Sequence, residues 1–447
     1  MRRPLKRAAP QFLGANPSAA RASRLTLITR GLPVARPTTS DAVTKVVDSR
    51  CAILESHGPV RPFPSLFSSR VVGSDRGTIT SYFRRTAALI SVSAMCGLAL
   101  SACGSSTAPT STSTTTTAKK AAIVDCPLTG TPAPGNVVPK RAPIAMKVDN
   151  YSLGPAPAEA RPQSGLDYAD IIFEEQVEGS ITRYAAVFQC RNAPALVGPI
   201  RSARWTDIQM LSELGHPIVV HVGGIQPVLS LINASALVNL DLGMNGDLET
   251  NPPGRYAPYD TYTSTRAVWL HEKQLTSPPS PVFSYSTTNP TGRAVSQVHL
   301  DWSYTSDIYW RWNVATGTWL RFYNVGSSSA PHITPDILSD GVQNQVQNVI
   351  VQDVNITYGP WVENSGGGLE AESHIIGHSG RAYVLRNGTM ITGTWVNTST
   401  GGPTRFLDSS GKDIALQPGR TWVELYPLGA PFEVTPAPTT PSTSAGN

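Results

Sequence analysis

The chain lacks the short motifs that mark several common enzyme classes. It contains no G-x-S-x-G nucleophile elbow, and its one S-x-x-K, Ser409 to Lys412, lies in a predicted turn. His374 and His378 are four residues apart, but no glutamate follows the first histidine as in the H-E-x-x-H zinc helix. The glycine-rich stretch 365–370 has no phosphate-loop lysine. We therefore expect no metal and no cofactor.

Long hydrophobic runs are scarce, and the run Thr86–Ala102 is short and rich in small residues for a membrane span. It follows the basic pair Arg84 and Arg85 and leads into Leu100-Ser101-Ala102-Cys103, which has the form of a bacterial lipobox. This order predicts a lipoprotein signal peptide over 72–102, cleaved before Cys103, whose thiol takes a diacylglycerol anchor. The alternative is a buried core helix.

The basic excess of the chain lies in its first part. Residues 1–70 hold twelve Lys and Arg against three acidic residues and show no sustained apolar period. We interpret 1–71 as a start assigned too far upstream, with the true start near Val71 or Val72, or as a disordered basic extension. From Gly104 onward there are 21 Lys and Arg against 27 Asp and Glu, so a nucleic-acid partner is not expected.

Cysteine is rare, with five residues in 447. Cys51 lies in the basic segment, Cys96 in the apolar run and Cys103 at the lipidation site, which leaves Cys126 and Cys190. In an oxidising compartment this pair predicts a disulfide, and the alternative is two free buried thiols. No histidine-bearing protease signature accompanies either residue.

Two kinds of folded segment lie between a Ser/Thr-rich tether over 103–124 and a predicted disordered tail over 431–447. Residues 125–280 alternate predicted strands and helices, which indicates an α/β domain. Residues 281–430 are rich in Trp, Tyr, Val and Thr, and Asn387-Gly388 is a strong hairpin signal. The predicted fold class is mixed, with an α/β domain followed by a separate, mostly antiparallel β domain.

Several long motifs carry a resemblance to a known family. MKVDN, VGPIRSAR, VVHVGG and GTWVN occur in this order, and together they resemble the YerB-like family of bacterial lipoproteins, a domain of unknown function with N- and C-terminal parts. The resemblance covers roughly 126–427. It implies an exported, membrane-anchored envelope protein and no particular reaction. Family members tend to carry P-H-N-L-Y-T where this chain has PYDTYT (258–263), so a role for that histidine does not carry over.

Arginines near a predicted helix start are the candidate ligand site. Arg201, Ser202 and Arg204 lie at the beginning of an amphipathic segment over 202–214, where free N–H groups attract anions. Arg183 and Arg161 complete the candidate set, and the ligand would be a carboxylate or a phosphate. The alternative is a structural salt-bridge network with four acidic residues, Asp170, Glu174, Glu175 and Glu178.

Carboxylates and one histidine are the candidate catalytic groups. If 171–178 is a strand, Glu174 and Glu178 share a face, roughly 13 Å apart, which is too far for a glycosidase pair on their own. His221 and Asp149 close two predicted strands at an edge where α/β sheets bind ligands. The alternatives are a salt-bridged face and a hydrogen-bonded core histidine.

Two functions follow from these patterns. The first is a non-catalytic lipoprotein on the outer face of the cytoplasmic membrane that binds an anionic wall component or an envelope protein. The second is a cell-wall hydrolase that uses the carboxylates or the His221/Asp149 pair.

Overall fold

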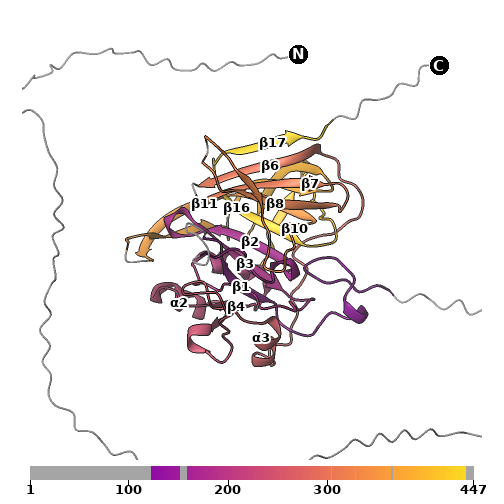
Figure 1. Cartoon of the computed structure of the whole chain (residues 1–447). Coiled ribbons are helices and arrows are strands. Elements are labelled where there is room, and N and C mark those ends of the chain that lie inside the picture. The colour runs from indigo at the N-terminus through magenta and orange to yellow at the C-terminus, as the bar shows by residue number, and fades with distance from the viewer. Residues whose placement is uncertain (1–121, 152–158, 304, 328, 364–365, 439–447) are drawn as a thin grey trace, which may run out of the picture. The chain divides into compact units, whose positions relative to one another are not determined.

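The computed structural model describes residues 122–151, 159–303, 305–327, 329–363 and 366–438 (Figure 1). The predicted signal peptide, the lipidation site Cys103 and most of the predicted tether lie outside the described residues. Among the described residues, no helix is long and apolar enough to cross a membrane.

Strands dominate the described chain. They are β1 (Ile144–Asp149), β2 (Ile171–Gln176), β3 (Thr182–Phe188), β4 (Ile218–His221), β5 (Val238–Asp241), β6 (Arg293–Ser303), β7 (Ser306–Asn313), β8 (Thr318–Asn324), β9 (Ile333–Pro335), β10 (Gln345–Val346), β11 (Asn348–Val362), β12 (Leu369–His374), β13 (Ser379–Arg386), β14 (Thr389–Val396), β15 (Arg405–Leu407), β16 (Thr421–Pro427) and β17 (Phe432–Pro436).

Helices are few and short in the same ranges. The α-helices are α1 (Thr206–Leu211), α2 (Gln226–Asn233) and α3 (Thr265–His271). Single 3-10 turns are η1 (Pro134–Asn136), η2 (Leu166–Tyr168), η3 (Glu178–Ser180), η4 (Ser212–Leu214) and η5 (Leu242–Met244).

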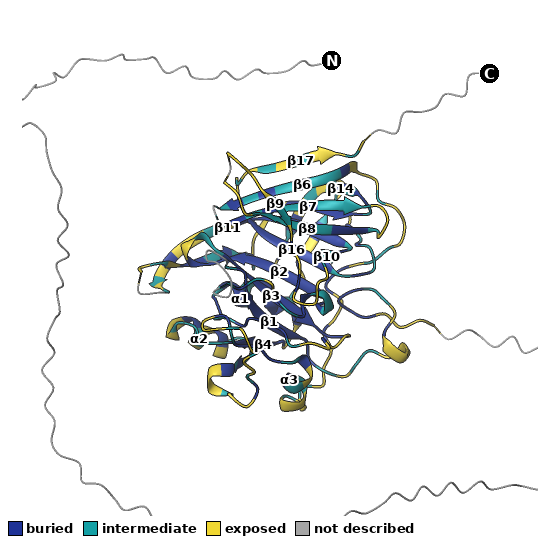
Figure 2. Cartoon of the chain, viewed as in Figure 1, coloured by how far each residue is buried: buried dark blue, intermediate teal, exposed yellow. Residues whose placement is uncertain are grey.

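One mixed sheet runs through both halves of the sequence. Its central strands lie side by side in the order β5-β4-β1-β3-β2-β16-β11-β13-β14. Strands β5, β4 and β1 are mutually parallel, and β3 runs antiparallel to β1 and β2. Most strands in this part are buried on both faces, as the dark blue ribbons of Figure 2 show.

The expectation of a separate α/β domain and β domain is wrong. Strand β16 pairs in parallel with β2, from Thr421 beside Ile171 to Glu424 beside Glu174 (Figure 1). On its other side β16 pairs in parallel with β11. Local patterning can mark a strand but not a partner about 250 residues away, and the pairing makes a single sheet of the two halves.

A second layer of strands covers one face of the central sheet. Strands β17, β6, β7 and β8 pair in succession, and β6 also pairs with β14. Aromatic rings fill the space between the layers, with Tyr184 and Trp310 each packing edge-on against Trp422. Residues Phe432–Pro436, which lie within the predicted disordered tail, form strand β17. Phe432 and Val434 of this strand pack against the aromatic core.

Helices α1 and α2 cover the other face. Met210 and Leu211 of α1 and Val228 and Ile232 of α2 lie in one apolar cluster with Ala145. The long strand β11 leaves the sheet and pairs with β12 as a hairpin, in which Asn355 lies beside His374. The hairpin contacts α1, where the Ser373 N–H donates to Thr206 Oγ1 (3.0 Å).

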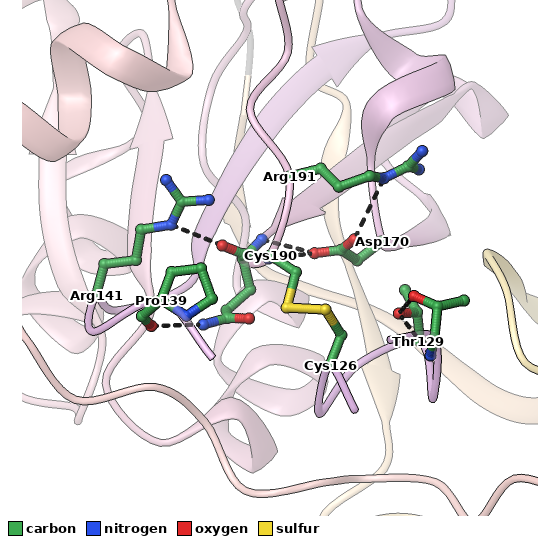
Figure 3. The surroundings of a disulfide bond; sticks show 9 residues. Cys126, Thr129, Pro139, Arg141, Asp170, Cys190 and Arg191 are labelled. Atoms are coloured by element: carbon green, nitrogen blue, oxygen red, sulfur yellow. Dashed lines mark hydrogen bonds and ion pairs between the residues drawn. A yellow bond between two sulfur atoms is a disulfide. The ribbon is translucent and has the colours of Figure 1, made fainter. Parts of the chain in front are cut away.

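The predicted disulfide between Cys126 and Cys190 is present (Figure 3). Cys190 follows β3, and its N–H donates to Asp170 Oδ2 (3.1 Å), just before β2. The bond therefore ties the first described segment to the end of β3. It joins the two cysteines that remained after the other three had been assigned elsewhere in the sequence.

Candidate functional site

The carboxyl ends of three parallel strands define one edge of the sheet. Asp149, His221 and Asp241 are the last residues of β1, β4 and β5, so they lie at the same edge. In open α/β sheets this is the edge at which ligands bind. A backbone turn closes over it, where the Gly223 N–H donates to Asp241 Oδ1 (3.1 Å) with φ at +67°.

Arg201 reaches this edge because its own backbone is part of it. The Arg201 N–H donates to the Lys147 carbonyl (2.9 Å), and the Val222 N–H donates to the Arg201 carbonyl (3.1 Å). The side chain turns to Asp149, with Nε 3.0 Å from Oδ2. The Asp149 side chain is only 3% exposed, whereas that of Arg201 is 27% exposed. Arg201 is thus anchored through its Nε and remains partly exposed to solvent.

The helix of this segment begins later in the structure than the sequence predicts. Helix α1 starts at Thr206, so Arg201, Ser202 and Arg204 lie in the segment before it, and Ser202 is not its N-cap. The N–H groups at this turn already have acceptors, since Arg204 N donates to Asp207 Oδ2 (2.8 Å) and Trp205 N to Glu370 Oε1 (2.6 Å). These two N–H groups are therefore not available to an anion.

Arg204 is buried and paired within the chain. Its Nε and Nη2 donate to the two carboxylate oxygens of Glu178 (2.8 and 2.6 Å), and its Nη1 lies 3.3 Å from Glu363 Oε2. Burial alone would raise the pKa of Glu178, but Arg183 and Arg204 together hold that pKa below its usual range. The salt-bridge alternative holds for this arginine.

Arg183 has weaker partners than Arg201 and Arg204. Its side chain is 3% exposed, its Nη2 lies 3.4 Å from Glu178 Oε1, and its Nε has no hydrogen-bond partner within the described ranges. Burial lowers the pKa of Arg183, and the positive charge of Arg204 lowers it further. The guanidinium of Arg183 contacts the backbone of Ser202 only at 3.5 Å.

Glu174 and Glu178 lie on opposite faces of the sheet. Glu174 accepts from Thr182 Oγ1 (2.8 Å) and pairs with the buried Arg321 (2.9 Å), between the two strand layers. Glu178 follows β2 in the turn η3 and returns to the α1 face, where Arg204 lies. The structure does not bring these two carboxylates together.

Arg161 belongs to the Glu174 face as well. Its Nη2 donates to Asn150 Oδ1 (2.7 Å), and its guanidinium lies over the ring of Tyr323, 4.1 Å from the ring centroid. It is therefore separated by the sheet from Arg183, which it was predicted to accompany.

His221 is held by neighbours other than Asp149. Its ring contacts the Gly223 carbonyl through Nδ1 (2.9 Å) and Asn239 Oδ1 through Nε2, and the residue is fully buried. Asp149 pairs with Arg201 instead. The predicted His221/Asp149 pair is not formed, and the core-histidine alternative describes the geometry.

Sequence reasoning missed Lys147 and Asp207 of the α1 face as partners of Glu175. Lys147 on β1 pairs with Glu175 on β2 and with Asp207 on α1 (2.6 Å), and all three side chains are fully buried. Burial raises the pKa of Glu175 to about 7. A lysine within an apolar strand run was the available signal for this cluster, because such a charge needs a partner.

Glu363 and Glu370 come from the β11–β12 hairpin and had no local signal. Burial raises the pKa of Glu370 to about 10, and a hydrogen bond with Glu363 supports the protonated form. Both glutamates face Arg204, which also pairs with Glu178, so Arg204 adds little free positive charge. Arg201, with Arg183 behind it, remains the accessible cation of this edge.

No group of three or more His, Cys, Asp or Glu side chains that could hold a metal ion is found among the described residues. The chemistry of the edge is that of arginines and carboxylates. A partly exposed guanidinium over a buried carboxylate can bind an anion bidentately.

The fold and this edge define a mixed-sheet protein whose charged groups are largely paired within the chain. A family model described as "Protein of unknown function (DUF3048) N-terminal domain" matches residues 128–276, and the corresponding C-terminal domain matches 298–423. The chain belongs to this family of unknown function, the YerB-like family.

A curated sequence and a solved structure illustrate the similarity. "Putative lipoprotein YerB" of Bacillus subtilis (strain 168) is 29% identical over 323 residues, which cover 67% of this chain and 86% of the relative. A crystal structure of the YerB protein from Bacillus subtilis superposes with a TM-score of 0.56 at 24% identity. That superposition covers 69% of this chain and 99% of the other, and it shows the common fold.

Proposed function

We propose that the protein is an exported lipoprotein of the bacterial envelope, anchored by Cys103, that binds an anionic wall component at Arg201. The similar lipoprotein of Bacillus subtilis supports the anchoring. The lipobox order of the sequence supports it independently.

The partly exposed Arg201 at the carboxyl edge of the parallel strands carries the binding proposal. Asp149 orients its guanidinium through Nε (3.0 Å), which leaves the outer nitrogens for a carboxylate or a phosphate. Arg183 lies behind Arg201 and adds positive charge to the site. Glu178 pairs with both Arg183 and Arg204, so one carboxylate does not neutralise both arginines. Ser202, the next residue in the chain, is half-buried, and we include its hydroxyl in the proposed site.

The hydrolase alternative gains no support from the geometry. Glu174 and Glu178 have separate partners on opposite faces, and His221 and Asp149 have separate partners at the edge. We do not propose a catalytic role for them.

Retention on purified wall material tests the proposal. We expect the purified chain to be retained and to be released by soluble anionic wall fragments at constant ionic strength. Uncharged glycan fragments are the control and should not release it. Release by salt alone, with no difference between the charged and uncharged fragments, would oppose a specific anion site.

A further inference from the structure

An apolar surface cavity lies far from Arg201 in the sequence, between two loops and strand β15. Its volume is about 250 Å³, and it opens to solvent. The walls include Val282, Phe283, Phe406 and Ile414, and two prolines, Pro281 and Pro403, also line it. The rings of Phe283 and Phe406 lie with centroids 6.1 Å apart. The cavity is therefore lined mainly by hydrocarbon, with aromatic faces in its wall.

A second, much smaller cavity lies next to it and holds a carboxylate. Its volume is about 10 Å³, and Phe283, Thr404 and Phe406 line both cavities. Glu213, from the turn η4 after α1, lines the small cavity. A space of this size holds about one water molecule.

Glu213 has no cationic partner in the described part of the chain. Its Oε2 accepts the Thr404 N–H (2.7 Å). Burial raises its pKa to about 7, and only the hydrogen bonds of Thr404 oppose that shift. The other charged groups that line the two cavities, Arg405 and Asp413, neutralise each other, with Arg405 Nε 2.9 Å from Asp413 Oδ1.

We propose that the two cavities form a binding site for a primary ammonium group at the end of an unbranched alkyl chain. The –NH3⁺ head has about the size of a water molecule, so it fits the small cavity beside Glu213 and supplies the missing positive charge. The alkyl chain lies against Phe283 and Phe406, whose faces favour a cation and methylene groups. The site is distinct from the anion site at Arg201 and does not depend on it.

The shape of the site selects the ligand class. A branched ammonium, such as that of tert-butylamine, is too wide for a space of one water molecule. An anion gains nothing there, because the one charged group without an opposite partner among the described residues lining the two cavities is the carboxyl group of Glu213. A lysine side chain and a free linear diamine present the same head and the same chain, so both chemical sources satisfy the site.

Calorimetric titration of the full purified chain tests this inference. The probes are 1,5-diaminopentane, Nα-acetyl-lysine amide and, as the control, tert-butylamine. We expect saturable binding of at least one linear probe and none of the branched one. Binding of both linear probes or only one tells whether the site takes peptide lysines, free diamines or both. Failure of both linear probes to bind up to about 10 mM overturns the inference.

The carboxylate is tested by substitution. Glu213→Gln keeps the acceptor for the Thr404 N–H but removes the charge, so affinity for the linear probe should fall about ten- to a hundredfold. Glu433→Gln, at a glutamate whose side chain is 76% exposed on β17, is the matched control and should bind as the parent does. Equal binding by Glu213→Gln and the parent contradicts the proposal.

A titration of the parent protein needs no variant and covers the case in which Glu213→Gln fails to fold. An ammonium favours the ionised carboxylate, so affinity should rise as pH increases through 7. By the same linkage, bound probe should lower the pKa of Glu213, as read from its carboxyl ¹³C shift. An unchanged pKa at saturating probe overturns the proposal.

Discussion

Glu178 is the carboxylate on which two buried arginines of the α1 face depend. It accepts two hydrogen bonds from Arg204 and lies 3.4 Å from Arg183. Both guanidinium groups are almost completely removed from water. The ionised carboxylate of Glu178 compensates the burial of these two positive charges. In turn, the two arginines hold the pKa of Glu178 below its usual range.

We therefore expect Glu178→Gln to lower the free energy of unfolding by about 3 kcal/mol or more, because it leaves buried positive charge without its partner. The difference from the parent should shrink as pH falls through the lowered pKa of Glu178, where the parent also loses its charge. Urea unfolding at several pH values measures this, with the exposed Glu433→Gln as control. A difference below about 1 kcal/mol at pH 7 would mean that Glu363 and Glu370 suffice for Arg204.

Single residues show the limits of local sequence patterns in this site. The pattern placed Arg201 and Asp149 at strand or turn ends, and the structure joins them. It placed Glu174 and Glu178 on one face because it extended β2 through 178, whereas the strand ends at Gln176 and a turn reverses Glu178. Glu363 and Glu370 reach Arg204 across more than 150 residues, which no local pattern encodes.

At the scale of elements, β16 decides how the molecule is assembled. It supplies the neighbour of β2 on one side and of β11 on the other. Its side chains also enter both layers, since Trp422 lies in the core between the strand layers and Val423 on the α1 face. Without β16, the N-terminal strands keep an unpaired edge at β2.

We expect residues 122–280 expressed alone not to form a stable monomer, because β2 loses β16 and the layer of β6–β8 no longer covers its face. Addition of residues 281–438 in trans should restore a native-like circular dichroism spectrum. The matched control is the continuous chain 122–438. Cooperative thermal unfolding of the isolated N-terminal piece as a monomer would show that the half is an independent domain.

The sequence predicted most individual strands and the disulfide but not the single sheet. Alternating and buried apolar runs mark strands locally, and the Asn387-Gly388 signal falls between β13 and β14 as expected. Strand pairing between distant segments depends on packing, and both Glu174 and Glu424 interrupt the apolar runs that meet at β2 and β16. These buried carboxyl groups become intelligible only in the folded structure, where Glu174 pairs with Arg321 between the layers and burial raises the pKa of Glu424.

At the scale of the whole molecule, the proposed anchor determines where the binding edge acts. Substitution Cys103→Ala removes the thiol that would take the lipid, so the protein should leave the membrane fraction or remain unprocessed. Fractionation of cells and mass spectrometry of the N-terminus measure this. The double alanine variant of Cys126 and Cys190 is a control for loss of a thiol and should stay in the membrane fraction. A processed Cys103→Ala protein that partitions into detergent like the parent would refute the anchor.

The most direct test of the account is the affinity of Arg201→Lys for soluble anionic wall fragments, measured together with its melting temperature. Lysine keeps a positive charge near Asp149 but loses the bidentate fork, so affinity should fall about ten- to a hundredfold while the melting temperature stays within about 2 °C. Arg381→Lys is the matched control, because Arg381 pairs with Asp353 through Nε at 2.9 Å in the same way. If Arg201→Lys melts several degrees lower yet binds the fragments like the parent, Arg201 is a structural residue and the binding account is contradicted.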